Sequence, residues 1–379
     1  MLRGRPVWTV VVAAIVVISL AAYLYLNQQN TPNSGSTTST TTEHATTNSA
    51  SLNKTAVPVG VFLYLWYGNL TTAAGGIGSP GWNSSSCPGG GAVVDQPNIG
   101  YYISDSNQTF QTQVREMQGA GTSFAVVSWW GPFTHGEAGS INRATLDLFK
   151  YLKGTNNTFR LAIMIDAFPG TCNPALPKVP MSQAYNYIFG NFAAPYKQWY
   201  FDWQGRPLLL TFNPVEPLYN DTRFTSREIG NYACKPVEGC PDHGLNKKLD
   251  WIFWQAPGNF SEGQGGTDVN MTNDIGAPVI SSDGEVTIVP RIDSYYNYLS
   301  SYQPGYLRFD SALQLGMYQY EWNYVLGHMP QVKLVLIYSW NEYHERSAIE
   351  PHDDPTGLVP AGYLLNVTSA YVAMLDSSQ

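Results

Sequence analysis

Two glutamates near the C-terminal end of the chain have the types and spacing for acid–base chemistry. Residues 334–354 read LVLIYSWNEYHERSAIEPHDD, an apolar run that stops at Glu342 and is followed by a second carboxylate at Glu345. Cleaving a glycosidic bond requires one carboxylic acid to protonate the leaving oxygen and another carboxylate to assist attack at the sugar. Repulsion between the two groups, with Trp340 and Tyr343 reducing their hydration, would raise one pKa and leave the other group ionised. The spacing alone also allows two ordinary surface carboxylates in a loop.

The same segment offers a metal site as an alternative. His344, His352, Asp353 and Asp354 lie close together in the sequence and have side chains that bind zinc or calcium. The HExxH and EF-hand patterns are absent, and a PHDDP sequence is more typical of a polar turn. We therefore expect neither a metal nor an organic cofactor.

The elements that must position the glutamates form a repeating series of strands and helices. Seven apolar runs are near-continuous, as expected for parallel strands that are covered on both faces. Helix-like stretches lie between them, and this alternation over residues 56–379 predicts an α/β fold, a (β/α)8 barrel. The alternative is an open doubly wound sheet, which no glycine-rich phosphate loop supports. The expected strands are residues 59–67, 123–130, 160–168, 206–213, 250–256, 286–292 and 332–340, and the helices 108–121, 142–154, 182–194 and 308–328.

Polar and aromatic side chains stand at the ends of several expected strands. In a barrel the carboxyl ends of all strands open on one face, which holds the active site. We therefore expect these residues to converge although they are far apart in the sequence. They are Trp66, Tyr67, Trp129, Trp130, Asp166, Asn213, Asn341 and Glu342.

The N-terminus has the pattern of a membrane anchor. Arg3 and Arg5 precede an uncharged run, residues 6–26, that would measure roughly 31 Å as a helix and match a bilayer core. The positive-inside rule places residues 1–5 in the cytoplasm and everything after residue 26 outside the cell membrane. A cleaved signal peptide is the alternative, but YLYLNQQN lacks a small-residue cleavage site.

The segment after the anchor and the composition agree with an exported protein. Residues 27–55 are rich in Ser and Thr and predict a flexible linker, followed by one domain over 56–379. With 20 Lys and Arg and a net charge of -8, the chain lacks the basic stripe that nucleic-acid binding needs. The sequence indicates no particular oligomeric state.

Cysteines and glycosylation sequons are typical of the same compartment. Cys234 and Cys240 are close enough in sequence to form a disulfide, which leaves Cys87 with Cys172, and metal ligation is the weaker alternative without CxxC spacing. Nine Asn-x-Ser/Thr sequons are consistent with a glycoprotein. They begin at Asn53, Asn69, Asn83, Asn107, Asn156, Asn220, Asn259, Asn270 and Asn366.

The segment SWNEYHERSAIEP, residues 339–351, resembles the SFNEWHEGTQIEP signature of glycoside hydrolase family 99, the endo-α-mannosidases and endo-α-mannanases. Further segments follow in the family's order, so that the resemblance extends over residues 56–379 and implies a (β/α)8 barrel. These segments are GVFLYLWYGN (60–69), VREMQGAGTSFAVVSWWGP (114–132), AIMIDAFPG (162–170), YFDWQGRPLLLTFNP (200–214) and VPRID near 290.

The resemblance implies separate duties for the site residues. Glu342 would act as a base on the sugar's own 2-hydroxyl to give a 1,2-anhydro intermediate, while Glu345 would protonate the leaving oxygen and later activate water. Substrate contacts would come from Trp66, Tyr67 and Asp166, with Asn341 and His344 orienting polar groups and Trp129 against a sugar ring. Glu350 would contact substrate or serve as a buried hydrogen-bond partner.

Some positions depart from the family pattern. Arg346 stands where the signature has glycine, Asp166 where we expect glutamate, and Gly81-Trp82 where the family has His-Trp. These departures put the mannose specificity in question, and Arg346 is the first position where a change of substrate is expected. The sequence thus favours an endo-acting retaining hydrolase of α-mannosidic or related α-glycosidic bonds. The alternative is a non-catalytic glycan-binding or cell-envelope protein on the same barrel.

Overall fold

A computed structural model describes residues 56–68, 82, 93, 95–166, 179–212, 219–232, 249–255, 278–291, 314–355, 357 and 359–378. These belong to one compact unit, Lys54–Gln379. The expected anchor, residues 6–26, and the linker, residues 27–55, lie outside the described residues. Among the helices of the described part, none is long and apolar enough to cross a membrane.

Eight parallel strands form the sheet that carries the fold. Each strand is hydrogen-bonded in parallel to the next, for example Val61 of β1 opposite Ala125 of β3. The first and last strands, β8 and β9, lie against each other, so the sheet closes almost completely. This confirms a barrel and excludes the open sheet, whose edges would lie far apart. The order is β8 (Trp251–Gln255), β7 (Thr225–Tyr232), β6 (Arg206–Phe212), β4 (Arg160–Ile165), β3 (Phe124–Trp129), β1 (Val59–Leu63), β10 (Leu334–Ile337) and β9 (Glu285–Ile288).

Three short strands lie outside this series. β5 (Asp202–Trp203) pairs antiparallel with the beginning of β6. β2 (Gln96–Pro97) pairs antiparallel with β11 (His352–Asp353), which joins the segment after β1 to the segment after β10. This small sheet becomes important for the site described below.

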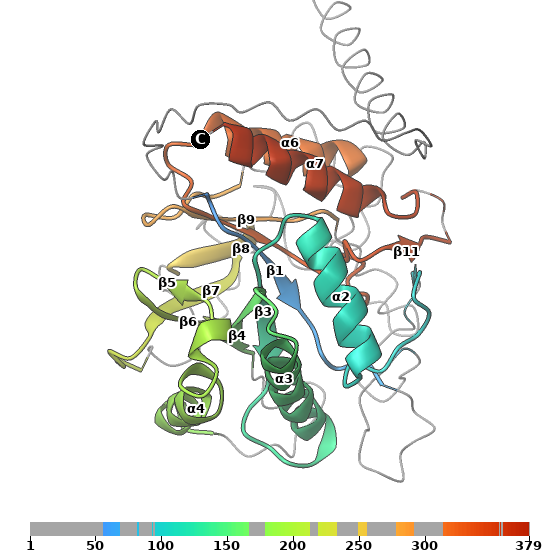
Figure 1. Cartoon of the computed structure of the whole chain (residues 1–379). Coiled ribbons are helices and arrows are strands. Elements are labelled where there is room, and N and C mark those ends of the chain that lie inside the picture. The colour runs from blue at the N-terminus through green and yellow to red at the C-terminus, as the bar shows by residue number, and fades with distance from the viewer. Residues whose placement is uncertain are drawn as a thin grey trace, which may run out of the picture. The chain divides into compact units, whose positions relative to one another are not determined.

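Helices cover the outside of the barrel after five of its strands. They are α2 (Asn107–Gly119), α3 (Gly136–Gly154), α4 (Met181–Ile188), α6 (Gln314–Gly327) and α7 (Tyr363–Ser377), and a π-helical turn (Phe189–Ala193) continues α4. Figure 1 shows α3 along β3, α2 beside α3, and α6 beside α7. The connections after β6, β7 and β8 each include residues outside the described ranges. The alternation of strand and helix is therefore seen only after the other five strands of the barrel.

Sequence determines where the first of these helices begins and which face it buries. Ser106 caps α2, since its Oγ accepts the backbone N–H of Thr109 at 3.1 Å. Phe110, Val114 and Met117 recur at helical spacing and are buried against the strands.

Two separate hydrophobic cores result from the alternation of side chains along the strands. Phe62, Val126 and Leu336 point into the barrel, whereas their neighbours Val61 and Val127 pack outward under the helices. A residue at the end of a strand therefore points towards the site only if its side chain continues the alternate positions that face the inside of the barrel.

Candidate active site

A tightly hydrogen-bonded loop at the carboxyl end of β10 carries the two glutamates. The loop folds back on itself, with Ser339 N–H donating to Ser347 O at 3.1 Å and Ile349 N–H to Ser339 O at 3.0 Å. Inside it, the Oγ of Ser339 accepts the backbone N–H of Glu342 at 2.7 Å. These bonds place Glu342 directly above the barrel interior and fix the direction in which the loop leaves the strand.

Glu342 is held by the residue two positions later. Its Oε1 accepts the backbone N–H of His344 at 2.9 Å and lies 3.3 Å from the Nδ1 of the same histidine. The side chain is 4% exposed. It is thus a nearly buried carboxylate whose Oε1 accepts the backbone N–H of His344 and lies beside its ring.

Glu345 lies in the same site and keeps its proton to a higher pH than an ordinary glutamate. Its Oε2 accepts the hydroxyl of Tyr338 at 2.5 Å. Burial raises the pKa of Glu345 to about 7, the negative charge of Glu342 contributes to the rise, and the hydrogen bond from Tyr338 opposes it. Two neighbouring carboxylates therefore differ in environment as an acid and a base must.

Asp166 brings a third carboxylate to this site from the end of β4. It accepts a 2.8 Å hydrogen bond from Ser128, and burial raises its pKa to about 6, with a contribution from the charge of Glu342. Burial raises the pKa of Tyr64, and the charges of Glu342, Asp166 and Glu345 raise it further. Tyr64 thus lies among all three acidic groups, which come from β4 and β10.

Aromatic rings flank the carboxylates. Trp66 is partly exposed, with its ring centroid 5.7 Å from that of Trp130 and 6.0 Å from that of His344. The indole of Trp130 donates to Ser128 at 3.2 Å, which links it to Asp166. Such partly exposed rings beside polar groups suit the apolar faces of sugars.

Solved structures with this architecture are known, although similarity at the sequence level is low. No family model matches the sequence, and no curated protein matches it. The structure is similar to the GH99 endo-alpha-mannosidase from Bacteroides thetaiotaomicron in complex with BIS-TRIS-propane, with a TM-score of 0.53 and 15% identity over 84% of this chain and 98% of that one. A second structure of the same enzyme gives a TM-score of 0.52 and 14% identity over the same shares of the two chains.

This chain has the fold of a GH99 endo-alpha-mannosidase. The structural resemblance expected from SWNEYHERSAIEP is thereby confirmed at the level of the fold, over most of the chain. Within this GH99-like barrel, the structure brings together Glu342, Glu345, Asp166, Trp66 and His344.

The prediction that Trp129 lies against a sugar ring is wrong. Trp129 is fully buried in the outer core, where its indole donates to Asn142 at 2.9 Å and its ring stacks on Tyr187. Because side chains alternate along β3, Ser128 and Trp130 face the carboxylates and Trp129 faces the helices. The next tryptophan in the sequence, Trp130, is the one that lies beside the carboxylates.

Asn341 and Tyr67 support the site from beneath instead of contacting substrate. The Asn341 amide accepts the N–H of Tyr64 at 2.8 Å and donates to the Tyr64 carbonyl and the Tyr102 hydroxyl, both at 2.9 Å. Tyr67 is 2% exposed and donates its hydroxyl to the carbonyl of Asn341. Asn341 thus orients polar groups within the protein, including the Tyr102 hydroxyl, and the buried hydroxyl of Tyr67 is engaged there instead of in the expected substrate contact.

Glu350 is a buried partner, which was one of its two expected roles. It is completely buried and accepts hydrogen bonds from Tyr102 at 2.9 Å, Gln113 at 2.9 Å and Tyr343 at 2.8 Å. Burial raises its pKa to about 7, against the effect of these donors. Glu350 therefore connects the loop to α2 and does not contact substrate.

Arg346 also differs from its expected place. Its guanidinium is only 1% exposed and bonds to Asp95 and Asp354. His352, one of the possible metal ligands, lies 3.8 Å from Asp95 in the same cluster. Arg346, Asp95 and Asp354 thus form a buried ion cluster with His352 beside it, and the substrate prediction for Arg346 is corrected.

The predicted disulfides cannot be compared with the structure. Cys87, Cys172, Cys234 and Cys240 all lie outside the described residues, as does Asn213. The pairing of Cys234 with Cys240 and of Cys87 with Cys172 stays a prediction.

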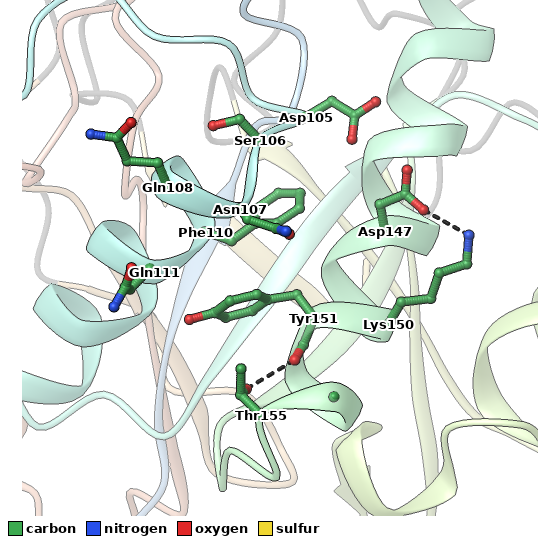
Figure 2. Close-up of a pocket in the computed structure, with 11 residues that line it drawn as sticks. Asp105, Ser106, Asn107, Gln108, Phe110, Gln111, Asp147, Lys150, Tyr151 and Thr155 are labelled. Atoms are coloured by element: carbon green, nitrogen blue, oxygen red, sulfur yellow. Dashed lines mark hydrogen bonds and ion pairs between the residues drawn. The ribbon is translucent and has the colours of Figure 1, made fainter.

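A separate pocket of about 720 Å³ lies between α2 and α3, away from the strand ends (Figure 2). Its aspartates already face cations: Asp147 accepts from Lys150 at 2.7 Å, and Asp105 accepts from Arg143 at 2.8 Å. The carboxylates at the strand ends are therefore better candidates for acid–base catalysis than the aspartates of this pocket.

Proposed function

We propose that the chain is an endo-acting, retaining glycoside hydrolase that cleaves α-mannosidic or related α-glycosidic bonds in glycans or polysaccharides. The observation that carries the proposal is the pairing of Glu342 and Glu345 in one site, with burial and the charge of Glu342 raising the pKa of Glu345 to about 7. Near neutral pH this leaves a substantial protonated fraction of Glu345 beside a carboxylate. The GH99-like fold supports a carbohydrate substrate.

The first half of the reaction uses both glutamates. Glu342 removes the proton of the sugar's 2-hydroxyl, and that oxygen attacks C1 while the bond from C1 to the leaving oxygen breaks. Glu345 gives its proton to the leaving oxygen. The products are a 1,2-anhydro sugar, protonated Glu342 and ionised Glu345, so the charge has moved from one glutamate to the other.

The second half reverses these roles. Ionised Glu345 takes a proton from water, whose oxygen attacks C1 and opens the strained ring, and Glu342 returns its proton to the 2-oxygen. Attack twice on the same carbon from opposite sides retains the anomeric configuration. No metal or organic cofactor takes part in either half.

The test is product analysis after incubating the detergent-solubilised full chain with α-mannans, N-glycans and other envelope polysaccharides. We expect Glu342→Gln and Glu345→Gln each to lower turnover by at least about a hundredfold, the usual effect of losing a general acid or base. Glu116→Gln, a change on α2, serves as the matched control and should keep wild-type turnover. Activity that is indifferent to both site changes would contradict the proposal, and binding without any product would favour the non-catalytic alternative.

We also propose that residues 6–26 anchor the chain in the cell membrane and that the barrel acts outside it. The two arginines before the apolar run support this orientation. Described sequon residues Asn107, Asn156, Asn220 and Asn366 are exposed and accessible to glycans. Protease added to intact cells should remove the barrel while residues 1–26 remain with the membrane, and a mature N-terminus beyond residue 26 would contradict the anchor.

A further inference from the structure

A buried cluster of opposite charges lies directly behind the glutamate loop. Arg346 donates to Asp95 Oδ1 at 2.9 Å and to Asp354 Oδ1 at 2.8 Å. Arg291 pairs with the same two aspartates, at 3.1 Å to Asp354 Oδ2. All four side chains are at most 2% exposed, so these bonds form away from water, where they are strongest.

The cluster joins segments that are distant in the sequence. Asp95 precedes β2 in the connection after β1, and Arg291 follows β9. Arg346 and Asp354 both belong to the segment after β10, where Arg346 precedes β11 and Asp354 follows it. The pairing of β2 with β11 runs beside the cluster. Three different strand ends are therefore tied together at one point behind the site.

The cluster also fixes the backbone of the loop. The Nε of Arg291 donates to the carbonyl of Arg346 at 2.7 Å. Arg346 itself has φ of 53°, in the left-handed region that residues with a side chain seldom adopt. Its side-chain bonds to Asp95 and Asp354 hold it in this conformation, and the residue immediately before it is Glu345.

We propose that Arg346 is a positioning residue that aims Glu345, because the buried cluster with Asp95, Asp354 and Arg291 locks the left-handed turn next to this glutamate. The inference rests on the proposed function and assigns Arg346 to the protonation of the leaving group. The proposal needs no contact between Arg346 and substrate, since the guanidinium is buried against Asp95 and Asp354.

The test separates positioning from stability by using two leaving groups. Arg346→Gly keeps the freedom to adopt a positive φ but removes the anchor. The double variant R346G/D354N removes one charge of each sign and keeps the cluster balanced, so that folding is protected. Arg346→Lys is the conservative variant, and Arg115→Gly, on the outer face of α2, is the matched control.

On α-mannan, whose sugar leaving group needs a proton, we expect R346G/D354N to lower kcat by about tenfold or more with little change in KM. On α-mannobiosyl fluoride, whose fluoride leaves without protonation, kcat/KM reports only the steps up to the release of fluoride, so the loss in kcat/KM should be at most about threefold. Arg346→Lys should recover part of kcat on α-mannan. Equal losses on the two substrates, or full activity of the double variant, would overturn the proposal.

Hydrogen exchange gives a readout that does not depend on activity. In R346G/D354N the amides of residues 341–350 should exchange faster, while those of β3 and β4 stay as in the wild type. Unchanged exchange in 341–350 would overturn the positioning role. A wild-type chain that cleaves neither substrate would instead refute the proposed function, and the exchange measurement would still decide whether the cluster holds the loop.

Discussion

The hydroxyl of Tyr338, at the end of β10, lies 2.5 Å from Oε2 of Glu345, seven residues later in the chain. This bond favours the ionised form of Glu345, whereas burial and the charge of Glu342 favour the protonated form. Catalysis by protonated Glu345 should decline as pH rises through its pKa, about 7. The basic limb of the pH–rate profile therefore reports the pKa of Glu345, which burial and Glu342 raise and the Tyr338 hydrogen bond lowers.

Replacing Tyr338 by Phe should move that limb to higher pH. Loss of the donor destabilises ionised Glu345, so its pKa rises, and the midpoint of the basic limb should increase by about one pH unit. The measurement is kcat/KM against pH. Tyr318→Phe is a matched control, because Tyr318 is also fully buried but bonds to Thr368 in the outer core. A limb that stays in place would show that the hydroxyl does not influence the acid.

Replacing Asp166 by Asn should move the same limb in the opposite direction. The negative charge of Asp166 helps to raise the pKa of Glu345, and at pH values above about 6 Asp166 is itself mostly ionised. Removing this charge lowers the pKa of Glu345, so activity should begin to fall at lower pH. The matched control is Asp202→Asn on β5, the short strand that pairs with the beginning of β6, and it should leave the pH profile unchanged. A shift to higher pH would contradict the charge relationship described for the site.

The neighbouring tryptophans of β3 should respond differently to truncation. Trp129→Ala empties a fully buried position and should lower the free energy of unfolding by about 3 to 5 kcal/mol. Trp130→Ala should leave most of the stability intact and weaken glycan binding by about tenfold, since its ring lies beside Trp66 at the site. Denaturant unfolding and titration calorimetry distinguish the two effects. Equal effects of both changes would contradict the alternation described for β3.

Asn341 should be needed for stability. Asn341→Ala leaves the buried N–H and carbonyl of Tyr64 without this partner and should cost about 3 kcal/mol or more of unfolding free energy. Asn323→Ala removes an exposed amide on α6 that accepts a hydrogen bond from the hydroxyl of Tyr371 on α7, and should change stability by less than about 0.5 kcal/mol. Comparable losses from the two variants would contradict the supporting role of Asn341.

The sequence was sufficient for the barrel because buried parallel strands read as apolar runs. Seven of the eight strands follow this pattern, but β7, TSREIGNY, does not. Its Arg227 pairs with Asp283, 56 residues away, and the N–H of Glu228 donates to Asp250. A strand whose polar groups bond to residues far away in the chain cannot be recognised from its own sequence, since those partners are brought together only by folding.

The convergence of the three carboxylates could be expected from the sequence for a similar reason. Glu342, Glu345 and Asp166 follow apolar runs, and the carboxyl ends of parallel strands meet on one face. The choice between Trp129 and Trp130 could not be made, because β3 is buried on both faces and its inward and outward residues are equally apolar. Phe124 and Val126 point into the barrel, and every second residue after them leads forward to Trp130. Only the structure, however, shows which of the two alternating sets of side chains points inward.

Arg346 combines a backbone conformation that usually favours glycine with a side chain that needs two aspartates. An arginine introduced there without both acidic partners would bring an uncompensated cation into the interior, and aspartates left behind without the arginine would be equally unfavourable. Positions 95, 346 and 354 are therefore expected to change together among related sequences. Lineages with glycine at 346 should need only one acidic residue at 95 or 354, as the partner of Arg291, and this covariation would record the history of the turn.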